Sequence, residues 1–210
     1  MAACVGGMAL AWGVGGFTAL HAASRDVTLT PPYTAAEHNT NVHCPDSEPW
    51  AVCRASAEVD AATGHMALSS SVDSGANGTT PSSAASAVAN GELIADLGIA
   101  PYQRHTVAVH LHVTDVAVSS SSDGRARLVV WARAQCDGCT ATPTQYAMPA
   151  RDGDLTLTIT LMSGASSGAR VLIGASADSG IDCHDFCIAT TGTGRTSASV
   201  TVAGIDASDA

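Results

Sequence analysis

The residues of this chain best suited to bind a ligand are two histidines, a tryptophan and two arginines within one stretch: His110, His112, Trp131, Arg127 and Arg133. The two histidines are two positions apart, which directs both imidazoles to one face of a strand, where they can hold a metal ion. An exposed indole presents a flat face to a sugar ring, and guanidinium groups supply planar hydrogen-bond donors. Histidine nearby makes such binding sensitive to pH.

The elements that carry these residues are two strands, because apolar and polar residues alternate on both sides of a serine-rich turn. The first apolar set is Val107, Val109, Leu111 and Val113, and the second is Ala126, Leu128, Val130, Ala132 and Ala134. We expect an antiparallel hairpin with its turn centred near Ser121 and Ser122. His112 is then opposite Trp131 and His110 opposite Arg133, so all five candidate residues share one outward face.

Three uses of that face remain open. The first is a binding site for a glycan or a cell-envelope polymer, and the second is an interface with an envelope protein. The third is a metal site on His110 and His112, which needs a further ligand such as His105 or His184. The plainer interpretation leaves the histidines solvated and Trp131 covered by another loop, with the arginines paired to carboxylates.

Composition excludes several classes of function. The 210 residues carry a formal net charge of -10, and all nine basic residues are arginines. A negative chain repels phosphate backbones, so nucleic acid is not an expected partner. There is no lysine for Schiff-base chemistry, and no pair of carboxylates has the spacing of an acid/base couple, so we expect neither catalysis nor a cofactor. The arginine-only, alanine-rich composition is typical of a GC-rich bacterial genome.

The N-terminal segment predicts export. Residues 1–20 are uncharged and largely apolar, and the small residues Ala22 and Ala23 suit a cleavage site. Residues 1–23 are therefore expected to be a signal peptide, or else an N-terminal membrane anchor, which would be the only contact with a membrane. Residues 24–50 show no periodicity and are expected to form a linker, with a single domain at 51–206. The expected location is extracellular or at the cell surface.

Six cysteines follow the leader in three close pairs: Cys44 and Cys53, Cys136 and Cys139, and Cys183 and Cys187. In an exported chain, an even number of cysteines favours disulfides, and local pairs are the simplest pairing. Zinc bound by the last two pairs with His184 is the alternative, because tetrahedral thiolate sites use such short spacings.

The rest of the chain indicates an all-β fold. Alternating runs occur at 53–59, 85–97, 155–161, 171–177 and 198–202, separated by Gly, Ser, Asp and Pro, and no amphipathic helix is evident. About eight strands of this kind predict an antiparallel two-sheet β-sandwich, preferably a jelly roll, with an immunoglobulin-like Greek key as the runner-up. The sequence therefore predicts a secreted or cell-surface, non-catalytic binding module. The alternatives are a structural or protein-interaction subunit of the cell envelope and a metal-binding protein.

Overall fold

A computed structural model describes residues 27–31, 33–44, 51–74, 85–121, 123–141, 144–165, 168–181 and 192–209. Every regular element among them is a β-strand. No helix in these ranges is long and apolar enough to cross a membrane. The expected signal peptide or anchor at 1–23 lies outside the described residues.

The strands form two antiparallel sheets. The seven-stranded sheet has the order β3 (Ala51–Asp60), β4 (His65–Ser74), β12 (Thr193–Asp209), β6 (Arg104–Ser120), β10 (Gly153–Met162) and β8 (Thr140–Ala141), and β1 (Val27–Leu29) pairs with β12. The five-stranded sheet has the order β2 (Ala35–His43), β5 (Ala85–Gly98), β11 (Gly168–Ile181), β7 (Gly124–Gln135) and β9 (Gln145–Ala147). The predicted two-sheet sandwich is confirmed.

Strand pairing selects the jelly roll over the Greek key of immunoglobulins. The pairs are nested along the chain: β7 pairs with β9, β6 with β10, β5 with β11 and β4 with β12. One long hairpin wrapped around the core gives this order in two sheets, which is the eight-strand jelly roll. Strands β2 and β3 extend the two sheets beyond it.

The predicted hairpin of β6 and β7 is wrong. Strand β6 pairs with β10 and β12, whereas β7 pairs with β11 and β9, so the two strands belong to different sheets. The chain passes from one sheet to the other between the end of β6 and the start of β7, and the Ser121 amide just after β6 donates to the Thr193 carbonyl at 2.9 Å. The apolar sets themselves face the core as predicted, although Ala126 and Ala134 at the two ends of β7 are only half-buried. Two strands bury alternate residues in the same way whether they lie in one sheet or in two facing sheets. Alternation alone therefore could not decide between these two arrangements of β6 and β7.

The segment expected to be a linker contains two strands. Strand β2 pairs with β5 from Ala35↔Ile94 to His43↔Ser86, and most of its residues are exposed. An edge strand held mainly by backbone hydrogen bonds needs no apolar alternation, which explains why the sequence showed none. Tyr33, just before β2, is buried in the core.

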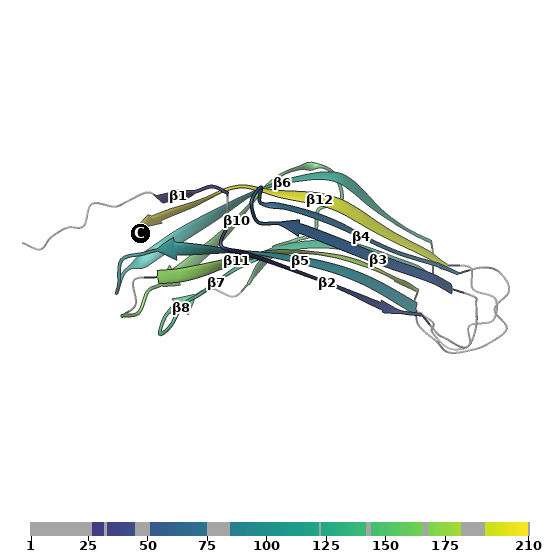
Figure 1. The fold of residues 1–210 in the computed structure, drawn as a ribbon, viewed down its shortest axis with the longest axis horizontal. Helices are drawn as coiled ribbons and strands as arrows, with labels where there is room; N and C mark the ends of the chain where they lie inside the picture. The colour runs from purple at the N-terminus through teal and green to yellow at the C-terminus, as the bar shows by residue number, and fades with distance from the viewer. Residues whose placement is uncertain are drawn as a thin grey trace, which may run out of the picture.

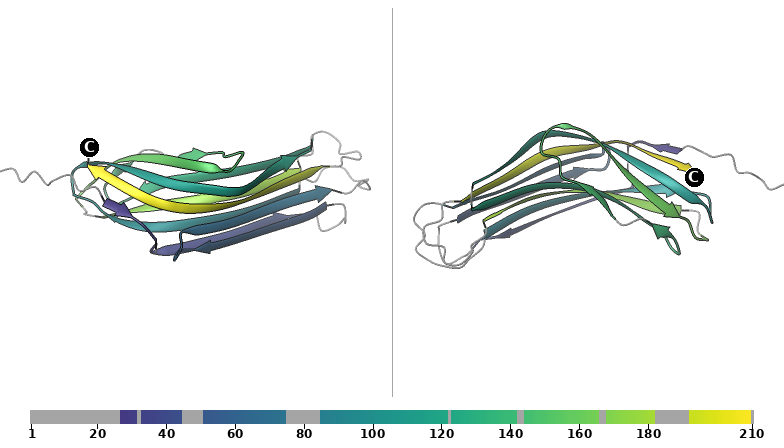
Figure 2. Two further views of the ribbon diagram at one scale, coloured as in Figure 1. Left: turned by 90° about the horizontal axis from the view of Figure 1, so that it is seen from above. Right: turned by 180° about the vertical axis from the view of Figure 1, so that it is seen from behind.

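Small aliphatic residues fill the space between the sheets, with Val107, Val109, Ile159 and Ile173 among the fully buried ones. Towards one end, a polar contact joins the sheets, because the hydroxyls of Ser70 on β4 and Ser179 on β11 lie 2.8 Å apart. Figures 1 and 2 show an elongated, bent sandwich with the five-stranded sheet on the inner side of the bend. The outer face of that sheet is therefore the concave face of the molecule.

Candidate functional site

The five predicted binding residues do not form one site. Trp131, Arg127 and Arg133 lie on β7, on the concave outer face of the five-stranded sheet. His110 and His112 lie on β6, on the outer face of the seven-stranded sheet. The core of the sandwich separates the two faces, so the predicted pairing of the histidines with Trp131 and Arg133 is wrong.

Trp131 rests on a position that has no side chain. Its direct partner on β11 is Gly174, and a Cβ added there would overlap the indole at Cζ2, Cε2 and Nε1. The ring therefore lies against the β11 backbone, where only glycine leaves room for it. The guanidinium carbon of Arg133 lies 5.4 Å from the ring centroid, a distance at which a cation interacts with the π-face.

A second aromatic residue extends this surface. Tyr146 on β9 is the direct partner of Trp131 on the other edge of β7, and 66% of Tyr146 is exposed. Directly opposed side chains share one face of a sheet and start about 5 Å apart. Gly174, Trp131 and Tyr146 thus form a row across three strands, with aromatic residues at two neighbouring positions of one face. We call this row, together with Arg133 and Glu92, the Trp131 platform.

Charged groups border the indole. Arg133 Nη2 lies 3.8 Å from Glu92 Oε2 on β5, a loose ion pair in which both groups remain partly exposed. Burial raises the pKa of the Glu92 carboxyl, Arg133 lowers it, and Glu37 on β2 raises it again, with a net increase. Glu37 is the direct partner of Glu92. The platform therefore combines an aromatic surface with a donor and acceptors beside it.

Arg127 lies further along the same face. It is four residues from Trp131, about 13 Å along an extended strand. Its Nη2 lies 3.7 Å from Asp178 Oδ2, and Arg125 Nε lies 3.7 Å from the other oxygen of the same carboxylate. Arg127 can thus contact a ligand that extends along β7, but not one confined to the indole.

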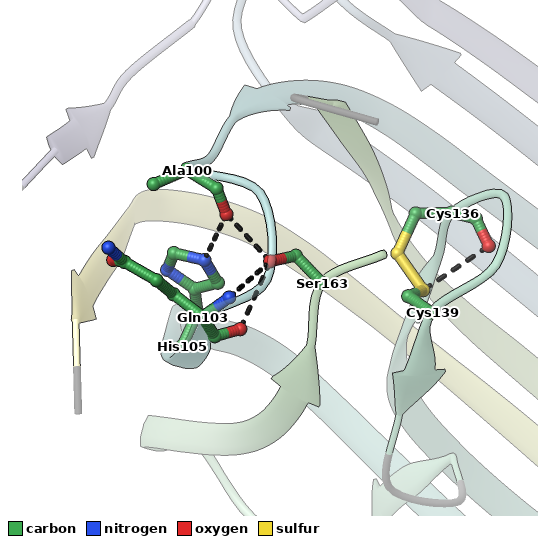
Figure 3. The surroundings of a disulfide bond; sticks show 6 residues. All are labelled: Ala100, Gln103, His105, Cys136, Cys139 and Ser163. Atoms are coloured by element: carbon green, nitrogen blue, oxygen red, sulfur yellow. Dashed lines mark hydrogen bonds between the residues drawn. A yellow bond between two sulfur atoms is a disulfide. The ribbon is translucent and has the colours of Figure 1, made fainter. Parts of the chain in front are cut away.

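The histidines of the opposite face are held by carboxylates. His110 has Thr156 Oγ1 at 3.1 Å from Nδ1 and Asp206 Oδ2 at 3.0 Å from Nε2. His112 Nδ1 lies 2.6 Å from Asp154 Oδ1. The third ligand that the metal hypothesis requires is missing from the described residues, where no group of three or more His, Cys, Asp or Glu is placed to hold a metal ion. His105 is buried instead, with Nε2 2.9 Å from the Ala100 carbonyl (Figure 3), and His184 lies outside the described residues.

Two of the predicted disulfides are present. Cys44–Cys53 connects the end of β2 to β3 and so joins the two sheets covalently. Cys136–Cys139 closes the turn after β7 (Figure 3). Each of these four cysteines is bonded to its partner in a disulfide and is not available as a thiolate for zinc. Cys183 and Cys187 lie outside the described residues.

Tyr146, Gly174 and Glu92 are the site residues that sequence reasoning missed. Two signals were available in the sequence. Tyr146 is an aromatic residue in a short segment rich in turn residues, and Gly174 is a glycine on the polar side of an alternating strand. Neither signal indicates a site until the register places both residues beside Trp131.

No protein-family model matches the chain, and no curated protein sequence matches it. Among solved structures, it is similar to one described as CBM4 structure and function, with 11% identity, a TM-score of 0.29 and coverage of 81% of this chain and 86% of that chain. Another is TmCBM61 in complex with beta-1,4-galactotriose, with 9% identity, a TM-score of 0.25 and coverage of 79% and 88%. Likeness at this level carries no functional argument, so the site itself has to supply one.

Proposed function

We propose that this chain is a non-catalytic binding module that takes a glycan on the concave face of the five-stranded sheet, at the Trp131 platform. The observation that carries the proposal is the row in which half-buried Trp131 lies against Gly174 with exposed Tyr146 as its direct partner on β9. One face of a sugar ring presents C–H groups that pack against an aromatic ring, and its rim presents hydroxyls. Arg133 and Glu92 supply the donors and acceptors that hydroxyls need.

The expected partner is a polysaccharide or cell-wall polymer, because the platform lies on an open sheet face that a long chain can cross. An extracellular or cell-surface location accords with this, since disulfides such as Cys44–Cys53 persist in oxidising compartments. The histidines have no part in this proposal, because the core separates them from the platform.

The test is retention on insoluble ligands. Purified protein is incubated with cellulose, xylan, galactan, chitin and bacterial cell walls, and the bound fraction is compared with that of Trp131→Ala and Tyr146→Ala. We expect selective retention by the parent protein on at least one polymer and loss of it in both variants. His112→Ala is the matched control, because it removes an exposed ring from the opposite face and should leave retention unchanged.

Other outcomes would contradict the proposal. Retention that survives in both aromatic variants would place the binding site elsewhere. Absence of retention on every polymer, together with a stable oligomer in size-exclusion chromatography that Tyr146→Ala disrupts, would favour the protein-interaction subunit instead. Circular dichroism of each variant shows whether a loss of binding reflects unfolding.

A further inference from the structure

We infer that the ligand is a linear, uncharged oligosaccharide chain that runs along β7 from the Trp131 platform into a cavity at the Gln135 end of the five-stranded sheet. The inference rests on the proposed function and adds a second subsite to it. The second subsite is a cavity at the end of β7, and a path lined with polar groups connects this cavity to the platform.

The cavity has a volume of about 690 Å³ and lies where β5 and β7 end and β11 begins. This volume is within the range of small-molecule sites, about 300–1,000 Å³. Gly98 and Gly168, direct partners in neighbouring strands, line it, and a Cβ added to either would have no atom within 4 Å. Two adjacent positions without side chains therefore leave a hollow that opens to solvent.

The wall of the cavity is fixed in place. Cys136 lines it, and the Cys136–Cys139 disulfide closes the turn beyond it. Gly164 packs so closely on this turn that an added Cβ would lie 2.6 Å from the Gly138 carbonyl oxygen. Figure 3 shows the segment that carries Ser163 beside the disulfide. The cavity is therefore a preformed feature of the fold, which lowers the entropic cost of filling it.

A continuous path joins the cavity to the platform. Trp131, Arg133 and Gln135 alternate with Ala132 and Ala134, which face the core, so the first three side chains point to the same concave face. The two ends of this path are four residues apart, about 13 Å along the strand. Several linked sugar rings can span that distance and a single ring cannot.

The polar groups at the cavity suit hydroxyls. Arg170 Nε lies 3.5 Å from Asp96 Oδ1, and both side chains remain more than half exposed. Gln135 is the direct partner of Arg170 and adds an amide. Arg133 and Arg170 each have a carboxylate partner along this path, and Glu37 and Asp137 add two further carboxylates, so the path repels anions as the whole chain does with its net charge of -10. Uncharged sugars fit such a surface better than polyanions do.

The experiment measures affinity against ligand length. Isothermal titration calorimetry is carried out with cello-, xylo- and galacto-oligosaccharides of one to six units. In Gly98→Leu, a side chain fills the cavity without touching the platform. Gly153→Leu is the matched control, because Gly153 is also an exposed strand glycine with no atom within 4 Å of an added Cβ, and it lies in the other sheet. Arg170→Ala tests the same subsite by removing a donor.

We expect the affinity of the parent protein to rise with length. Gly98→Leu should bind the longest oligosaccharide about tenfold more weakly while leaving the shortest bound ligand unaffected. Gly153→Leu should match the parent, and Trp131→Ala should lose binding at every length. Equal binding of long chains by the parent, Gly98→Leu and Arg170→Ala would overturn the subsite but leave the platform in place. If the parent binds none of these sugars, the proposed function fails and the subsite with it. If Gly98→Leu does not fold, Arg170→Ala alone decides.

Discussion

The indole of Trp131 lies on the backbone of Gly174, its direct partner across β7 and β11, and any Cβ at that position would overlap the ring. Gly174→Ala must therefore push the indole away from the sheet into solvent. We expect a stability loss of about 1 kcal/mol, at the low end for overpacking because the ring has solvent to move into. Glycan retention should fall together with a red shift in tryptophan emission. Gly153→Ala is the control, and an unchanged emission spectrum in Gly174→Ala would contradict this geometry.

A second close approach, between Gly64 and Tyr33, fixes the chain ahead of β2. Gly64 has a φ of 69°, and an added Cβ would lie 2.6 Å from Tyr33 Cε2. Gly64→Ala thus combines a left-handed backbone, which costs about 1–2 kcal/mol for a residue with a Cβ, with a steric clash. We expect urea denaturation to show a loss of about 2 kcal/mol or more. In a Tyr33→Ala background the loss should be smaller, because the left-handed backbone and the looser contacts with Pro31 and the Val202 carbonyl remain without the Tyr33 clash, and equal losses in both backgrounds would exclude that clash.

The phenol of Tyr33 should make stability sensitive to alkaline pH. Its side chain is buried, and this burial raises the pKa of Tyr33 to about 12. The folded chain favours the neutral phenol, so this contribution to stability is fully present below the unfolded pKa of about 10 and is lost as pH rises through about 12. The free energy of unfolding should therefore fall more between pH 8 and pH 11 in the parent than in Tyr33→Phe. If the free energy of unfolding changed with pH equally in the parent and in Tyr33→Phe, the raised pKa of Tyr33 would be contradicted.

The alternation of apolar and polar residues predicted where the strands lie better than it predicted which strands pair with one another. Alternation located the strands that became β6, β7 and β10, since one buried face imposes it. It could not tell whether β6 and β7 share a sheet or face each other, because their apolar sets meet in the core either way. That ambiguity placed His112 opposite Trp131, when the sandwich core separates them.

The site was predictable only in part, for the same reason. Trp131, Arg127 and Arg133 are candidates from the sequence alone because their residue types stand out within one strand. Tyr146 and Glu92 became part of the site only through pairing with distant strands, which no local pattern encodes. Strand β2 was missed because an exposed edge strand lacks a buried face.

The Cys44–Cys53 disulfide should be a substantial source of stability, because it restricts the unfolded chain and joins the end of β2 to β3 in the opposite sheet. In the chain-entropy model, closing the loop between these two cysteines stabilises by about 2–3 kcal/mol. We expect the double variant Cys44→Ser/Cys53→Ser to lose about that amount in urea denaturation. The Cys136–Cys139 disulfide closes a still shorter loop, so the double variant Cys136→Ser/Cys139→Ser should lose less free energy of unfolding. The reverse order would contradict the entropic argument.

Glu92 should link stability to pH at the site itself. Burial raises the pKa of its carboxyl, partly opposed by Arg133 and supported by Glu37. Because the protonated form is favoured on folding, the contribution of Glu92 is fully present below the unfolded pKa and is lost as pH rises through the raised value. Glu92→Gln, a neutral isostere, should thus be more stable than the parent at neutral pH, with the difference shrinking in acid.

A direct measurement is the carboxyl carbon resonance of Glu92, followed by NMR as pH falls. Glu37→Gln removes a like charge from its direct partner, so the Glu92 pKa should move down in that variant. Arg133→Ala removes the opposite charge, so the pKa should move up, and a ligand that draws Arg133 away from Glu92 should shift it in the same direction. An unchanged titration in both variants would show that neither Arg133 nor Glu37 interacts with Glu92, which would contradict the charge arrangement described for the platform.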